Sequence, residues 1–126
     1  MLHPRGFTLI ELLMVIVIIG ILTTILIPRF ANTREKAFVA AMKSDLRNLA
    51  TAEESYYYDY ATYAATLGQM PSYNTTQGVT VAVNQATQAG WSGTASSIHT
   101  ARQCFFFVGN ATPVGVATEE GQVACN

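Results

Sequence analysis

One carboxylate stands alone in the most apolar part of this sequence. Glu11 is the single charged residue between positions 7 and 27. An acidic side chain inside a membrane helix costs about 2.5–3.5 kcal/mol on insertion scales, so it needs a compensating cation. If the chain were cut after Gly6, Glu11 would lie four residues after a new amino terminus at Phe7. There a cationic amine and the helix dipole both favour negative charge, and the amine could belong to the same chain or to a neighbour.

The residues around the apolar run favour cleavage before it. A secretory signal has a basic tip, an apolar stretch and then a small-residue cleavage site. Residues 28–32, Pro-Arg-Phe-Ala-Asn, offer no such site after the run, whereas the small residue Gly6 precedes it. Cleavage after Gly6 would remove the basic tip and leave the apolar helix on the mature protein, headed by Phe7.

The two cysteines, Cys104 and Cys125, have the wrong spacing for a CxxC metal or redox motif, and no histidine cluster accompanies them. A disulfide is the better interpretation, and two unpaired thiols are the alternative. The bond would close a loop of roughly 20 residues and contribute about 3 kcal/mol in the chain-entropy picture. It would persist only outside the reducing cytosol.

A long helix must position the N-terminal residues. Residues 7–27 are almost wholly apolar, and the charge-free run within them is intermediate in length between a core helix and a membrane span. Beyond Pro28 an apolar stripe recurs at steps of three and four. We therefore expect one helix from about Phe7 to about Tyr57, on the order of 75 Å long, with two helices broken at Pro28 as the alternative. The stripe consists of Phe38, Met42, Leu46, Leu49, Ala52 and Tyr56.

The second half of the chain is rich in Gly, Thr, Ser, Asn and Gln and predicts strands. Alternation and β-branched runs indicate strands at residues 79–83 and 104–108, with weaker signals at 91–99 and 114–118. We expect a small antiparallel sheet of about four strands, and with the helix an α+β fold. The expected turn residues are Gly78, Gly90, Gly93, Gly109, Asn110, Pro113 and Gly121.

The N-terminal quarter resembles a known family. The likeness to the class III signal peptide and N-terminal helix of type IV pilins and type II secretion pseudopilins is close over about residues 5–30, and beyond that it is one of layout. It rests on the run Gly6-Phe7-Thr8-Leu9-Ile10-Glu11-Leu12-Leu13, followed by Gly20 and Pro28.

The resemblance implies a role for each matching residue. A membrane aspartic prepilin peptidase would cut after Gly6 and N-methylate Phe7. Glu11 would pair with the terminal amine of an adjacent subunit. Gly20 and Pro28 would bound the stretch of helix that becomes extended in assembled pili, in keeping with their poor helix propensity. The resemblance also implies that Cys104 and Cys125 close a C-terminal disulfide loop.

The implied organisation is a lollipop of four regions. Residues 1–6 form the leader peptide, 7–28 the hydrophobic membrane and filament-core helix, 29–58 its amphipathic continuation packed on the head, and 59–126 the globular β head. The expected function is a structural subunit of a type IV pilus, supporting adhesion, motility or DNA uptake. The alternative is a type II secretion pseudopilin or a minor pilin.

The expected partners follow from the same resemblance. They are identical or related pilin subunits, the prepilin peptidase, an inner-membrane assembly platform and membrane lipid before assembly. The chain is expected to cross the inner membrane once and then to enter an extracellular filament. A formal net charge of −1 provides no basic field for phosphates, so no specific nucleic acid is expected.

The head's composition favours the pilin over the pseudopilin. Major pseudopilins typically carry acidic calcium ligands in their C-terminal loops, whereas the acids after Asp59 are Glu119 and Glu120 alone. Two adjacent carboxylates make a poor cage for an ion that needs 6–8 oxygen ligands. We therefore expect no metal and no cofactor.

Few side chains offer catalytic chemistry, so no enzyme is expected. His99 would be the single histidine after processing, and no glycine-rich phosphate loop occurs. We expect His99, in a weak strand, to be an exposed or packed side chain. The acids Glu53, Glu54 and Asp59 are expected to be solvated.

Five closely spaced tyrosines follow or end the predicted helix. We expect them to cap the helix and pack beneath the sheet with their hydroxyls wet. The alternatives are electron transport along a filament and stacking on single-stranded DNA. The cluster consists of Tyr56, Tyr57, Tyr58, Tyr60 and Tyr63.

Overall fold

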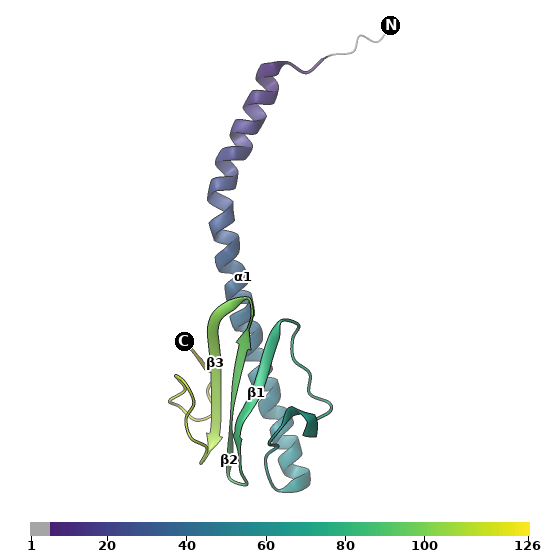
Figure 1. Cartoon of the computed structure of the whole chain (residues 1–126), viewed down its shortest axis with the longest axis vertical. Helices are drawn as coiled ribbons and strands as arrows, with labels where there is room; N and C mark the ends of the chain where they lie inside the picture. Colours follow the sequence, from purple (N-terminus) through teal and green to yellow (C-terminus); the bar gives the residue numbers. More distant parts are fainter. Residues whose placement is uncertain (1–5) are drawn as a thin grey trace. The chain divides into compact units, whose positions relative to one another are not determined.

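The computed structural model describes residues 6–126 and confirms the expected α+β fold. One helix, α1 (Leu9–Tyr60), is followed by a short 3₁₀ helix, η1 (Leu67–Gln69), and then by the strands (Figure 1). The strands are β1 (Val79–Ala86), β2 (Gly90–Ser97), β3 (Thr100–Gly109) and β4 (Ala124–Cys125). Contacts divide the chain into two compact units, which meet between Arg34 and Glu35 and are described separately below.

The helix runs through Pro28 without a break, so the prediction of a single helix is confirmed and the alternative of two helices is wrong. Pro28 lacks one backbone donor, yet the helix formers on both sides continue the hydrogen-bonded ladder. The helix begins at Leu9, two residues later than expected, because Thr8 caps it. It ends three residues later than expected, where Ala61 adopts a left-handed conformation with φ 54°.

In the first unit every described residue up to Arg34 is exposed. The exposed side chains include the large apolar residues of the N-terminal run, whose exposed fractions range from 83% at Leu9 to 47% at Val15. Soluble monomers rarely expose contiguous apolar surfaces of this extent. By length and composition this helix can cross a membrane.

The second unit contains an antiparallel meander with the strand order β1-β2-β3-β4. The central register pairs Val81 with Ala95, and Ala95 with Cys104. Between Val83 and Gln85 the register shifts, because Asn84 is an extra residue on β1 that opposes no partner. The expected sheet of about four antiparallel strands is confirmed.

The position of the fourth strand was predicted wrongly. Residues 114–118 form turns, whereas Ala124 and Cys125 pair with Phe105 and Cys104 to make β4. Pro113 and Gly115, which has φ +58°, interrupt the weak alternation of this segment. A Cβ on Gly115 would lie 2.5 Å from the Phe105 ring, so the turn passes directly over that ring.

Two glycines expected in turns lie in β2 instead. Gly90 begins the strand and Gly93 is inside it, where glycine permits close approach of neighbouring groups. A Cβ on Gly93 would lie 3.1 Å from the Trp91 ring and 3.4 Å from Leu49. The glycine therefore makes room for the Trp91 ring between the strand and the helix.

The main core lies between α1 and one face of the sheet, and it confirms the predicted stripe. Met42, Leu46 and Leu49 are fully buried, while Phe38, Ala52 and Tyr56 are partly buried against the same cluster. Trp91 and Phe106 pack with ring centroids 5.2 Å apart. A second cluster on the opposite face contains Phe105, Phe107, Ala111 and Ala117. The C-terminal segment covers it.

Candidate functional site

The Glu11 carboxylate is bound by the residue that caps the helix. Its Oε2 atom accepts hydrogen bonds from the Thr8 backbone N–H at 2.9 Å and from the Thr8 hydroxyl at 2.7 Å. The Glu11 N–H donates in return to Thr8 Oγ1 at 3.3 Å. This is a capping box, in which two unpaired donors at the helix start are satisfied reciprocally. Thr8 therefore folds the carboxylate back toward the N-terminal end of α1.

Thr8 was not among the predicted site residues, although its signal is in the sequence. A threonine three residues before a glutamate, ahead of an apolar run, is the capping-box pattern. The two residues before it, Gly6 and Phe7, are exposed, and nothing lies within 4 Å of the position of a Gly6 Cβ. Gly6, Phe7 and Glu11 are thus grouped at one exposed chain segment, next to the Thr8 cap.

Gly20 and Pro28 both lie inside the regular part of α1. No atom lies within 4 Å of the position of a Gly20 Cβ, so packing in the single chain does not require glycine there. Its cost to the helix, about 1 kcal/mol relative to alanine, is therefore unexplained by contacts within the described chain. Extension of the stretch that the two residues bound stays a prediction.

The predicted disulfide between Cys104 and Cys125 is present, and the alternative of two free thiols is wrong. The two cysteines are register partners in β3 and β4. Next to them Asn126 N donates to the Gln103 carbonyl at 3.2 Å, and Gln103 N donates to Asn126 Oδ1 at 2.8 Å. The bond and the short ladder together hold the chain end against the edge of the sheet.

Glu53 is buried, so the expectation that it is solvated was wrong. Its side chain is fully buried in the main core, where Oε2 accepts a hydrogen bond from Ala64 N at 2.8 Å. Oε1 has no hydrogen-bond partner among the described residues. Burial raises the pKa of Glu53 to about 7, against the opposing effect of the Ala64 hydrogen bond. Glu54 and Asp59 are exposed, as expected.

A second buried acid, Asp45, binds the segment that connects the helix to the sheet. Its carboxylate accepts hydrogen bonds from the Thr76 N–H and the Thr76 hydroxyl, both at 2.8 Å. The Tyr73 hydroxyl donates to the Asp45 carbonyl at 3.0 Å, and burial raises the pKa of Tyr73. Asp45 and Glu53 therefore fix residues 61–78 onto α1. Each of the two acids lies four residues from Leu49 of the predicted stripe, and this was the one sequence signal for their role.

The tyrosine cluster is divided between core and surface. Tyr56 and Tyr63 pack against the core as expected, whereas Tyr58 is 90% exposed and Tyr60 is 64% exposed, contrary to the expectation. Tyr56 stacks on Tyr60 with ring centroids 4.4 Å apart, and Tyr57 lies 4.8 Å from Tyr63. Burial and a hydrogen bond to Glu54 raise the pKa of Tyr63 to about 12.

His99 lies in the turn between β2 and β3, so the expected strand position was wrong. Its exposed ring stacks on Phe38 of α1 with centroids 4.4 Å apart. Among residues 6–126 no group of three His, Cys, Asp or Glu side chains is placed to hold a metal ion.

The chain thus combines an apolar N-terminal helix, a single capped acid near the start of that helix, and an antiparallel β-sheet that follows it. Known proteins with similar sequences share the N-terminal part of this arrangement. Residues 1–27 match the prokaryotic N-terminal methylation motif. The type IV major pilin protein PilA of Myxococcus xanthus is 40% identical over 70 residues, which cover 53% of this chain and 32% of that protein.

Two secretion proteins are similar to the chain as well. The type II secretion system core protein G of Pseudomonas aeruginosa is 38% identical over 64 residues, covering 51% of this chain and 45% of that protein. Core protein G of Aeromonas hydrophila is 36% identical over 87 residues, which cover 69% of this chain and 54% of that protein. The matches thus span about a third to a half of these relatives. The motif and the relatives together support assignment of the chain to the type IV pilin and pseudopilin superfamily.

Proposed function

We propose that the chain is a structural subunit of a type IV pilus, assembled from an inner-membrane prepilin after leader cleavage. The observation that supports this most is Glu11. It is an acid near the start of a helix whose other side chains up to Ile27 are uncharged, and Thr8 is its partner within the described chain. An acid in that position is costly in lipid unless assembly provides a cation.

Processing creates that cation. A prepilin peptidase in the membrane cuts between Gly6 and Phe7 and methylates the new amine of Phe7. Exposure of Gly6, with open space around it, supports access by the peptidase. The capping box supports the same step, because it already holds the Glu11 carboxylate toward the end of the helix where the amine forms.

In the proposed filament, residues 7–28 of many subunits bundle in the core, since their apolar surface is unstable in water. Glu11 of one subunit pairs there with the Phe7 amine of its neighbour. The stretch bounded by Gly20 and Pro28 extends on assembly. The chain therefore crosses the inner membrane once before assembly and becomes extracellular afterwards, and its role in adhesion, motility or DNA uptake is structural, not enzymatic. An assembly platform in the inner membrane would load it.

The head supports a pilin over a pseudopilin. The C-terminal segment is closed by the disulfide between Cys104 and Cys125. Of the two late acids, Glu120 accepts a hydrogen bond from Gly109 N at 2.6 Å, so its carboxylate serves the fold. The second candidate function is a type II secretion pseudopilin or a minor pilin, and the 87-residue match to a core protein G favours it.

The phenotype of a gene deletion would distinguish between these candidate functions. A pilus subunit predicts loss of surface filaments and of the motility that depends on them, with type II secretion unchanged. Electron cryo-microscopy of sheared filaments should then show this chain as the repeating subunit. Loss of secretion with normal filaments would instead establish the pseudopilin, and filaments reduced in number but built from another chain would establish a minor pilin.

A further inference from the structure

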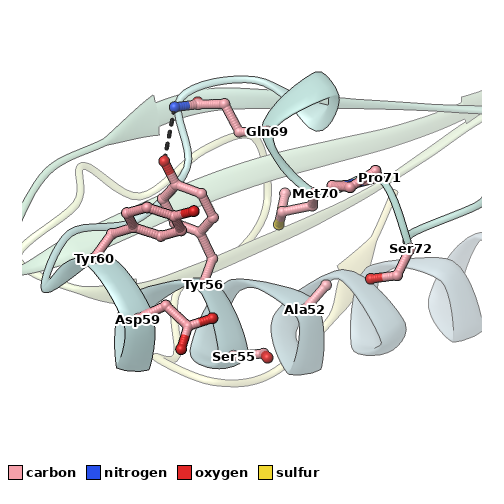
Figure 2. Close-up of a pocket in the computed structure, with 9 residues that line it drawn as sticks. All are labelled: Ala52, Ser55, Tyr56, Asp59, Tyr60, Gln69, Met70, Pro71 and Ser72. Carbon is pink, nitrogen blue, oxygen red and sulfur yellow. Dashed lines mark hydrogen bonds between the residues drawn. The ribbon is translucent and has the colours of Figure 1, made fainter.

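A groove follows the C-terminal part of α1, between the helix and the segment from η1 to β1. Two adjoining cavities, of about 190 Å³ and about 440 Å³, share the lining residues Ala52, Ser55 and Ser72. Figure 2 shows the first cavity, with α1 on one side and residues 69–72 on the other. We call the joined cavities the helix–loop groove. The larger cavity alone lies in the range of about 300–1,000 Å³ that small-ligand sites occupy.

Most of the residues that line this groove carry a hydroxyl or an amide group. Within the described chain, the side chains of Asn48, Ser55, Ser72 and Asn74 make no hydrogen bonds, and all four residues are exposed. The carboxylate of Asp59 adds the one charged group to the lining. The groove therefore offers both donors and acceptors that are free to bind a ligand.

One wall of the groove is a fixed aromatic face. Tyr60 stacks on Tyr56 at 4.4 Å, and the Gln69 amide donates to the Tyr56 hydroxyl at 3.0 Å (Figure 2). That hydrogen bond and the partial burial of Tyr56 hold the pair in place. Tyr60 remains 64% exposed beside these hydroxyl and amide groups, so a ligand can reach its ring.

We propose that the helix–loop groove binds a neutral oligosaccharide. A pyranose ring presents flat C–H faces and a rim of hydroxyl groups, each of which both donates and accepts. The Tyr60 face fits the C–H surface of one ring and the Asp59 carboxylate fits its hydroxyl rim, while the amides of Asn48 and Asn74, in the second cavity, fit hydroxyl groups of a further ring of the same oligosaccharide. This site needs only the folded second unit, so it is independent of the proposed pilus function.

The charge and polarity of the lining favour a neutral oligosaccharide over anionic polymers and apolar peptides. No Lys or Arg lines the two cavities, and Asp59 repels anions, which disfavours nucleic acids and acidic polysaccharides. The free hydroxyls and amides would be left unpaired beneath an apolar peptide, which disfavours that occupant as well.

The test is an NMR titration of the full-length, isotope-labelled chain in a detergent without a sugar headgroup. The probes are a maltose oligomer, a cellulose oligomer and a chitin oligomer, with an oligogalacturonate as the anionic comparison. At least one neutral probe should give saturable shifts at Ser55, Asp59 and Ser72, and the oligogalacturonate should bind more weakly. Saturable binding elsewhere, or none by any neutral probe, would overturn the proposal.

Three variants and a matched control complete the test. Tyr60→Ala removes the aromatic face, and Asp59→Asn removes the charged acceptor. Ser55→Leu fills the groove with a larger side chain. Each should weaken binding, Tyr60→Ala by about three- to tenfold, which corresponds to the usual worth of an aromatic contact. Tyr58→Ala, at a 90% exposed tyrosine outside the groove, should bind as the parent chain does. Trp91 emission reports folding in each variant, and equal affinities for Tyr58→Ala and Tyr60→Ala would refute the site.

Discussion

At the scale of single residues, Glu11 has two successive partners in the proposed assembly pathway. In the free chain Thr8 donates two hydrogen bonds to its carboxylate, which lowers the cost of placing the charge in lipid. In the filament the amine of a neighbouring Phe7 replaces or joins Thr8. The acid is thus tolerable in the membrane and more stable in the filament.

Replacement of Glu11 tests this directly. Glu11→Ala or Glu11→Gln should still insert and be cleaved, because a neutral residue enters lipid more easily. It should assemble poorly, since the charge pair that draws subunits together is missing. Immunoblots of the processed subunit and filament counts by electron microscopy measure the two effects. Filaments of normal number and length would mean that apolar packing alone sets the subunit register.

Gly6 has a prediction of its own. Gly6→Val should block processing, because the peptidase must fit a small residue before the scissile bond. The uncleaved chain should accumulate in the membrane, and mass spectrometry of the parent protein should find Phe7 as its first residue. Gly20→Ala, a change to a small residue away from the junction, is the control and should be cleaved normally. A mature terminus other than Phe7 would contradict the assignment.

Glu53 makes the stability of the head depend on pH. Its folded pKa of about 7 lies above the ordinary 4.5, so the stabilising contribution is complete below about pH 4.5 and is lost as the pH rises through about 7. Glu53→Gln, which stays neutral, should unfold at a higher temperature than the parent chain at pH 8, with little difference at pH 4.

The single tryptophan, Trp91, is fully buried and reports this unfolding by fluorescence. Glu119→Gln, at an exposed acid, is the matched control and should change the pH dependence little. An unaltered pH profile in Glu53→Gln would show that Glu53 titrates normally in the folded chain.

At the scale of elements, the disulfide and β4 hold the C-terminal segment on the sheet. Cys125→Ser, or reduction, should loosen residues 118–126 and lower stability by up to about 3 kcal/mol. Residues 111–117 should stay better protected, because Ala111 and Ala117 anchor this segment in the cluster with Phe105 and Phe107. Limited proteolysis of the full chain measures this, with circular dichroism as the control for an intact helix. An unchanged cleavage rate would contradict the prediction.

The sequence predicted those elements whose signals are local. The apolar run and the stripe at steps of three and four defined α1, and two cysteines without metal spacing indicated the disulfide. β4 was missed because two residues, Ala124 and Cys125, carry no periodicity, and their pairing depends on the distant β3. Residues 114–118 showed alternation, but Pro113 and Gly115 place them in turns.

The buried acids were missed for a related reason. Glu53 and Asp45 have charged side chains, which composition assigns to the solvent. Their partners are the backbone N–H groups of Ala64 and Thr76, 11 and 31 residues further along. Only the folded chain brings those donors to the helix. In contrast, the Thr8 cap was readable, because its pattern spans four residues.

At the scale of the whole molecule, the two units differ in the solvent that they require. Residues 6–34 expose apolar side chains, whereas residues 35–126 contain both core clusters. A chain that begins at Glu35 should therefore be soluble without detergent and keep Trp91 buried, while the full-length chain should need lipid or detergent. Aggregation of the truncated chain, or an exposed Trp91 in its emission spectrum, would contradict this division.

The register shift at Asn84 has a consequence for a crowded polymer. β1 is an edge strand, and an edge with free backbone groups can template pairing with the same strand of another copy. A bulge twists such an edge and interrupts its ladder. Asn84 also turns its side-chain carbonyl inward along the sheet, where it accepts a hydrogen bond from the Thr94 hydroxyl at 2.8 Å. In the proposed filament, the extra residue would therefore oppose edge-to-edge pairing of β1 between neighbouring heads, so that subunits at very high local concentration would remain separately folded.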